Sequence, residues 1–159
     1  MEVGFKLDAK RLAQAFDNAE GKLRGELILT MKKAARNVAS RAKREHRFIT
    51  RGGRLEASID DGLQSSDPIV GYVTAGGANA PYAAVIHGGS GLHGPNRARY
   101  PIVPRFRKVL RWAGGGKFVF AKKVMHPGVK PDPFLDKALE AEVPAIETMF
   151  NQAIDNSLK

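Results

Sequence analysis

The chain has 159 residues and carries 26 Lys and Arg against 16 Asp and Glu, which gives a formal net charge of +10. An apolar share of 43% at this length suits one globular domain and excludes wholesale disorder. The absence of cysteine excludes a disulfide scaffold, a thiolate nucleophile and a Cys-ligated metal. No apolar run reaches the length of a membrane span and no signal segment opens the chain, so we expect a soluble protein with no membrane partner.

The charge is unevenly distributed along the chain. Residues 1–60 contain 14 basic and 8 acidic side chains, and residues 68–131 contain 10 basic and none that is acidic. Residues 132–159 reverse the balance, with 6 acidic against 2 basic. A positive net charge indicates a polyanionic partner such as nucleic acid. The reversal also allows copies of the chain to match charges with one another, or both regions can be plain solvated surface.

A single long helix is predicted over residues 8–47, with Asp8 as its N-cap. Its apolar residues recur at spacings of three and four, a period that a strand cannot produce. They are Leu12, Phe16, Ala19, Leu23, Leu27, Met31, Ala34, Val38 and Ala42. Gly21 and Gly25 are weak points where we expect a bend or a break, although the stripe resumes in register after them.

The second half of this helix is strongly basic. The candidate residues for a surface that faces a polyanion such as DNA are Lys32, Lys33, Arg36, Arg41, Lys43, Arg44 and Arg47. Gly52 and Gly53 then end the helical segment.

Residues 54–124 change to short segments separated by turn signals. The alternation of Leu55, Ala57 and Ile59 with polar residues predicts a half-buried strand. After a turn at Asp67-Pro68, residues 69–74 form the next strand, residues 82–87 a third extended or short helical segment, and residues 87–95 a flexible glycine-rich loop. Two apolar runs, 100–112 and 117–124, flank a glycine-rich link and predict a protruding β-hairpin over residues 100–124. Pro101 and Pro104 make the first part of that hairpin an edge or irregular.

A C-terminal helix is predicted over residues 133–157. Pro144 is expected to kink it or split it in two. Its apolar stripe consists of Leu135, Ala138, Leu139, Val143, Ile146, Met149, Phe150 and Ile154. The layout of helix, antiparallel strands and helix predicts a single α+β domain over residues 1–159.

The sequence contains no constellation typical of an active site. His87 and His93 lie six residues apart, which matches no common zinc spacing, and the glycine-rich stretch lacks the features of a phosphate-binding loop or a dinucleotide fingerprint. Ser90 does not occupy a Gly-x-Ser-x-Gly elbow. Residues 68–131 contain no acid, so they cannot supply paired carboxylates or a two-metal site. We therefore expect no catalytic residue, no metal, no cofactor and no enzymatic activity.

The predicted hairpin is the stronger feature because aromatic residues alternate there with cations. Such an arm can track DNA phosphates and stack on bases, or its aromatic residues can make subunit contacts. We favour subunit contacts, because exposed apolar patches usually mark interfaces. The candidate contact residues are Arg105, Phe106, Arg107, Arg111, Trp112, Phe118 and Phe120.

Three blocks of the chain carry a resemblance to a known family. Residues 50–59 resemble a "TG-x-LR-x-SI" segment that follows a long helix, residues 80–89 resemble "YA-x-x-x-E-x-GT", and residues 124–135 resemble "HPG-T-x-x-x-PFL" before an acidic helix. In this order and spacing they are similar to the head–tail joining, or tail-completion, proteins of long-tailed bacteriophages. The matching positions are Gly53, Leu55, Ser58, Tyr82, Ala83, His87, Gly88, His126, Pro127, Gly128, Pro133 and Phe134. His87 stands where the family usually has Glu, and Gly89-Ser90 replaces Gly-Thr, so no role is carried over to that acidic position.

The resemblance implies a structural protein of the virion neck, assembled in the host bacterial cytoplasm and without catalytic activity. It implies a homo-oligomeric ring, commonly a hexamer, between the portal or adaptor ring of the head and the tail terminator or tail tube. Genomic double-stranded DNA would pass through the channel of that ring, and the basic residues of the long helix would face either this DNA or the portal ring. The alternative that the residues leave open is a free-standing basic DNA-binding protein. A phage nuclease is a third class, which the missing acidic cluster disfavours.

Overall fold

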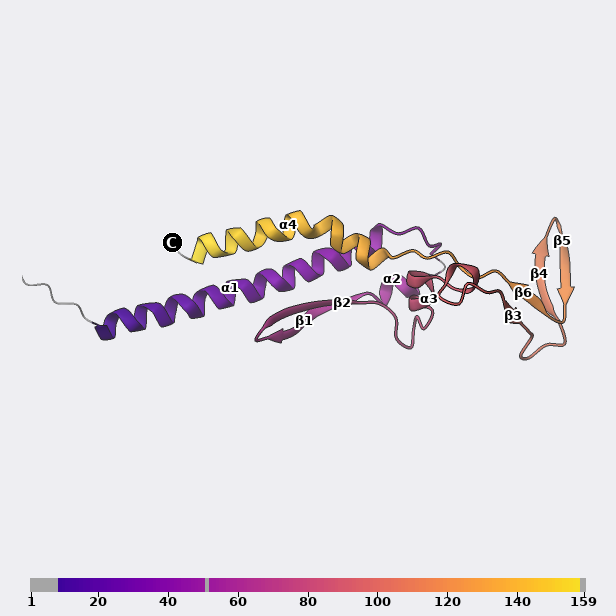
Figure 1. Cartoon of the computed structure of the whole chain (residues 1–159), viewed down its shortest axis with the longest axis horizontal. Helices are drawn as coiled ribbons and strands as arrows, with labels where there is room; N and C mark the ends of the chain where they lie inside the picture. The colour runs from indigo at the N-terminus through magenta and orange to yellow at the C-terminus, as the bar shows by residue number, and fades with distance from the viewer. Residues whose placement is uncertain (1–8, 51, 158–159) are drawn as a thin grey trace, which may run out of the picture. The chain divides into compact units, whose positions relative to one another are not determined.

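The computed structural model describes residues 9–50 and 52–157 (Figure 1). Two long helices and three two-stranded antiparallel ladders make an α+β chain, as the sequence predicts. The elements are α1 (Ala9–Arg44), α2 (Arg54–Ala57), β1 (Asp60–Ser66), β2 (Ile69–Thr74), α3 (Ala83–Gly88), the 3₁₀ turn η1 (Gly91–His93), β3 (Tyr100–Ile102), β4 (Leu110–Gly114), β5 (Lys117–Ala121), β6 (Val124–His126) and α4 (Phe134–Ser157).

The residues group into two compact units. The first comprises residues 1–44, 59–74 and 135–159, and the second comprises residues 45–58 and 75–134. The chain passes between the units four times, so each unit is built from segments that are distant in sequence. Compact units defined by contacts are not by themselves separate domains, so the single domain over residues 1–159 stays a prediction.

Helix α1 runs unbroken through Gly21 and Gly25, so the expected bend or break at these glycines does not interrupt it. It ends at Arg44, three residues before the predicted end. The reason is visible just beyond it, because the backbone N–H groups of Arg47 and Phe48 donate to the Asp132 carboxylate and not to a helical carbonyl. The predicted N-cap Asp8 lies outside the described residues.

Among the α1 side chains that the structure describes, the buried ones all lie in the C-terminal half of the helix. Ala34, Ala35, Val38, Ala39 and Ala42 lie in the core of the first unit. Phe16, which belongs to the predicted stripe, is 67% exposed, and nothing is described of the Leu12 side chain. The apolar period therefore continues well beyond the part of α1 that its own unit covers.

The β1–β2 hairpin lies along α1 (Figure 1). Arg36 pairs with Asp61 at the start of β1 over 3.9 Å, and Arg24 pairs with Asp67 at the hairpin turn over 3.5 Å. These two pairs orient β1 antiparallel to α1. The predicted strand at 69–74 and the turn at Asp67-Pro68 are both confirmed.

The predicted strand over residues 55–59 is wrong, because Arg54–Ala57 forms the single helical turn α2 and the strand begins at Asp60. Leu55 and Ile59 are both buried, and Ala57 between them is exposed. Residues four apart share a face in a helix as well as in a strand, so the alternation did not distinguish the two.

Helix α4 is antiparallel to α1, since Arg41 of α1 bonds Glu142 near the start of α4 and Lys22 of α1 reaches the carbonyl of Asn156 near its end. Alanines at 138 and 153 form part of its buried face. The helix continues across Pro144, so the proline does not split it in two.

The second unit contains α2, α3, η1 and two of the ladders. Its buried centre is formed by Leu55, Ala80, Ala83 and the fully enclosed Phe134. The segment at 82–87 is a helical turn, α3, which was one of the two expected conformations. The predicted hairpin over residues 100–124 is present as two successive ladders, β3–β6 and β4–β5, with residues 103–109 between them outside regular structure.

No helix within residues 9–50 and 52–157 has the length and apolarity to cross a membrane.

Candidate functional site

The β4–β5 ladder is a two-residue β-hairpin with apolar side chains on both faces. Gly115 and Gly116 form its turn with φ of +59° and +79°, as a type I′ turn requires. Arg111 pairs with Phe120 and Ala113 with Phe118, so these four side chains share one face. The opposite face carries Trp112 and its partner Val119.

Every apolar residue that we expected to make contacts in this region is exposed. Phe118 and Phe120 are 57% and 60% exposed, and Phe106 in the preceding loop is 96% exposed. The guanidinium of Arg111 lies 3.9 Å from the centroid of the Phe118 ring, a cation–π contact that holds the cation on the aromatic face. Arg105, Arg107, Arg111 and Trp112 are exposed as well. We call residues 105–123 the arm.

A two-stranded hairpin is marginal by itself in water. The arm buries little on either face and contains seven cations and no acid. Large apolar groups held on an open hairpin are typical of a surface that is covered in an assembly. The arm is therefore the strongest interface candidate in the described chain.

The twelve positions that carry the family resemblance all lie in the second unit. Leu55, Ala83 and Phe134, one from each block, are buried. The His87 ring meets the edge of Phe134 at a centroid distance of 5.4 Å, and Ser58 Oγ accepts a hydrogen bond from the Gly76 N–H. Packing and a backbone contact thus account for five of the twelve positions, and the structure brings together three blocks that are far apart in sequence.

The glycine-rich loop is braced against the His126-Pro127-Gly128 segment. Ser90 N–H donates to Val129 O, Leu92 N–H donates to Pro127 O, and the Val129 N–H donates to Ser90 Oγ. A Cβ at Gly91 would lie 2.7 Å from the Gly128 Cα, and one at Gly128 would overlap the Ser90 carbonyl. The two backbones approach so closely that only glycine fits. The expected flexible loop is instead a fixed crossing of two segments.

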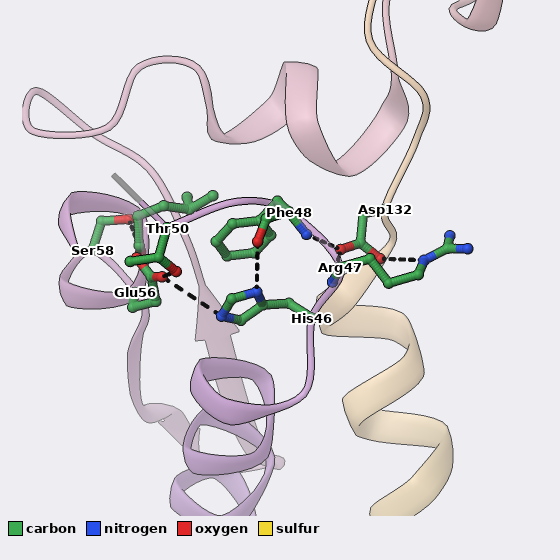
Figure 2. A network of polar contacts seen from close by, with 8 residues as sticks. His46, Arg47, Phe48, Thr50, Glu56, Ser58 and Asp132 are labelled. Atoms are coloured by element: carbon green, nitrogen blue, oxygen red, sulfur yellow. Dashed lines mark hydrogen bonds and ion pairs between the residues drawn. The ribbon is translucent and has the colours of Figure 1, made fainter. Parts of the chain in front are cut away.

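A polar cluster joins the segment after α1 to the segment before α4 (Figure 2). The buried carboxylate of Asp132 accepts from the backbone N–H groups of Arg47 and Phe48, at 2.5 and 3.1 Å, and from Arg47 Nε at 3.4 Å. Phe48 stacks on His46 at 3.7 Å and meets the edge of Phe134 at 5.3 Å. Asp132 therefore fixes the loop that carries these aromatic rings.

Glu56 completes this cluster on its other side. Its Oε1 accepts from the Thr50 hydroxyl and lies 3.6 Å from His46 Nε2 (Figure 2). Burial raises the pKa of the Glu56 carboxyl, but hydrogen bonds from Thr50 and from its own backbone N–H, together with the His46 charge, outweigh burial and leave the pKa below its ordinary value. The carboxylate is thus held in its charged form.

Four residues of the cluster, Arg47, Phe48, Glu56 and Asp132, form part of the wall of an open groove of about 1430 Å³ in the second unit. Arg47, Arg54 and Lys130 contribute cations to the wall, and Tyr82 and Ile86 contribute apolar surface. Both carboxylates of the wall, Asp132 and Glu56, are already engaged by the cluster. The groove therefore combines three cations with a largely apolar wall, and its two acids are held in separate contacts of the cluster.

The seven basic residues predicted to face DNA or a portal ring differ in their surroundings. Lys32, Lys33, Arg36, Lys43 and Arg44 are exposed and fall within about a third of the helix circumference, opposite the buried alanines. Arg41 is different because its Nε donates to Glu142 Oε1 at 2.6 Å, inside the contact between α1 and α4. Arg47 is exposed along its side chain but belongs to the Asp132 cluster. Five of the seven predicted residues therefore form an exposed basic face on the C-terminal half of α1.

Two functional features were missed by reasoning from sequence. Asp132 carries the cluster, although the residues around it in sequence give no sign of this role. Leu139 and Val143, which belong to the apolar stripe of α4, are 51% and 42% exposed and lie beside the exposed Glu140 and Glu147. A helical projection of the sequence places these apolar and acidic residues on one side of the helix. It does not show which part of the wide apolar stripe is buried by the rest of the chain.

Within residues 9–50 and 52–157, no three His, Asp or Glu side chains gather as ligands for a metal ion. No model of a known family, no curated protein and no solved structure matches the chain.

Proposed function

We propose that this chain is a structural subunit of a bacteriophage neck, a head–tail joining or tail-completion protein. In this proposal, copies close a ring, commonly sixfold, that sits in the virion between the portal or adaptor ring and the tail terminator or tail tube. The order and spacing of the three sequence blocks support this proposal, as does their packing in one unit.

The observation that carries the proposal is the exposed arm. A lone monomer gains nothing from holding Phe106, Phe118 and Phe120 in water, whereas a subunit surrounded by neighbours buries them. Head-to-tail contacts that close a ring require two different, complementary patches on each copy. The arm and the C-terminal helix α4 are such a pair, because the arm is basic and α4 is acidic and both expose apolar side chains.

The test is assembly of the purified chain, followed by light scattering after size exclusion and by negative-stain images, alone and with portal and tail-tube proteins. Neutralising Arg105, Arg107 and Arg111 to Gln is expected to abolish rings or their incorporation into necks. The matched control neutralises Lys32, Lys33 and Arg36, which removes the same charge from α1 and leaves self-association intact. Normal necks from the arm variant would contradict the proposal.

The second candidate is a free-standing DNA-binding protein, and the observation that favours it is the basic face of α1. Five cations on one helix face can contact phosphates without reading sequence. This candidate predicts a monomer or dimer whose affinity for duplex DNA falls with a log–log salt slope of about −4.5 if five phosphates are contacted. Rings together with a shallow salt slope would exclude it.

A further inference from the structure

The exposed face of α4 combines apolar and acidic side chains in a pattern that matches the arm. Leu139 and Val143 are separated by four residues, so they lie on one face about 6 Å apart along the helix. Glu140 and Glu147 lie three residues before and four after Val143, on the same side. All four are exposed in the folded chain, although Ala138 beside them is buried. The apolar stripe of α4 is thus wider than the surface its own unit covers.

The aromatic face of the arm has the corresponding dimensions. Phe118 and Phe120 are two residues apart on β5, which places them about 6.7 Å apart on one face. Arg111 lies on the same face, with its guanidinium against the Phe118 ring. Two aromatic rings and a cation on the arm therefore match two aliphatic side chains and flanking carboxylates on α4, at nearly equal spacing.

From this match we infer that the arm of one copy docks on α4 of the next copy, with Phe118 and Phe120 against Leu139 and Val143 and with Arg111 facing Glu140 and Glu147. The inference rests on the proposed function, and it names the two patches through which the ring grows.

The charge and the apolar side chains of the arm favour a second copy of the chain, and not DNA, as its partner. The arm has seven cations and no acid, and α4 has five acids and one cation within Phe134–Ser157. DNA phosphates would satisfy the cations but would leave the two phenylalanines in water, because duplex DNA offers no unstacked base to cover them. An acidic helix with exposed aliphatic residues satisfies both. Such opposite surfaces also speed encounter and set the register.

The absence of native cysteine makes this contact directly testable by disulfide trapping. A copy with Ala113→Cys, on the aromatic face of the arm, is mixed with a copy with Val143→Cys and oxidised. The matched control replaces Val143→Cys by Ala145→Cys, which is exposed on the same turn but about 160° around the helix. We expect at least tenfold more mixed cross-link with Val143→Cys than with Ala145→Cys. Equal yields, or no mixed cross-link, would overturn the inference.

Charge exchange supplies a second, independent readout. Arg111→Glu in one copy and the pair Glu140→Arg with Glu147→Arg in another should each abolish self-association, and thermal melting checks that each variant folds. In a mixture, the intact arm of the α4 variant meets the intact α4 of the Arg111→Glu copy, and the charge reversed by Arg111→Glu faces the charges reversed by Glu140→Arg and Glu147→Arg, so mixing should restore association. Self-association that persists in either variant alone would refute the arm–α4 contact.

The two assays separate this inference from the proposed function. If rings form without the Val143-specific cross-link, the arm–α4 contact is refuted and the neck proposal is unaffected. A specific cross-link in open chains that never close, even with portal and tail proteins present, supports the contact and removes the ring.

Discussion

Arg41 on α1 donates a hydrogen bond from Nε to Glu142 Oε1 on α4 over 2.6 Å, and both side chains are largely withdrawn from water. The pair joins two helices whose sequences are a hundred residues apart and whose buried faces consist mainly of alanine. Because alanine offers little area, a directional contact contributes a large share of what specifies how the helices meet.

Removing one member of this pair should destabilise the first unit. Arg41→Ala leaves the Glu142 carboxylate without this donor, and we expect a loss of about 2 kcal/mol in the free energy of unfolding. Urea denaturation of the wild type and the variant measures this difference. Lys43→Ala, an exposed cation on the same helix, is the control and should change stability by less than about 0.5 kcal/mol. Equal effects from both would show that the ion pair is not the cause.

Gly21 and Gly25 lie within a continuous helix, and a Cβ added at either would meet no atom within 4 Å. Alanine in place of each glycine should stabilise the helix by about 1 kcal/mol, since it lowers the entropy of the unfolded chain without a clash. Helical circular dichroism through a thermal melt gives the readout. A loss of stability in the monomer would contradict the continuous helix. If the alanine variants are more stable as monomers but necks fail to assemble from them, the glycines are needed for a close contact between subunits.

Gly128→Ala should have the opposite effect on the second unit. Gly128 has φ of +98°, and an added Cβ would overlap the Ser90 carbonyl. The strained backbone alone costs about 1–2 kcal/mol, so the crossing of the two loops should open. Hydrogen exchange at the Ser90 and Leu92 amides, which donate across this crossing, should accelerate strongly. Gly77→Ala, at another positive φ but in open space, controls for backbone strain without the clash.

The lowered pKa of Glu56 makes one part of the stability dependent on pH. A carboxyl whose pKa is lower in the folded state stabilises the fold above its unfolded pKa, near 4.5, and this contribution is lost as the pH falls through the lower folded value. We therefore expect the free energy of unfolding of the second unit to fall below about pH 4.5. Glu56→Gln should lower this free energy near neutral pH, and the variant should then lose less stability on acidification than the wild type. The difference between the two unfolding curves should shrink toward acid. A constant difference from pH 7 to pH 3 would mean that Glu56 carries no such contribution.

Reasoning from sequence succeeded where local pattern controls local structure. The long helix, the strand at 69–74, the Asp67-Pro68 turn, the glycine hairpin and the C-terminal helix follow from period, turn residues and proline placement. It failed at residues 55–59 because a buried pair four residues apart fits a helical turn as well as a strand. It placed the end of α1 three residues late because Asp132, 85 residues after Arg47, captures the backbone N–H groups there.

The candidate surfaces divide in the same way. Composition alone determined that a basic, aromatic hairpin and an acidic helix occur in one cysteine-free chain, because charge and residue type are local properties. Only the tertiary structure decided that Arg41 is an internal partner of Glu142, while Lys32, Lys33, Arg36, Lys43 and Arg44 remain exposed. It also decided that the aromatic face of the arm and the stripe beside Glu140 stay uncovered. Whether a residue is buried depends on which segments pack against it, and these segments are often distant from it in sequence.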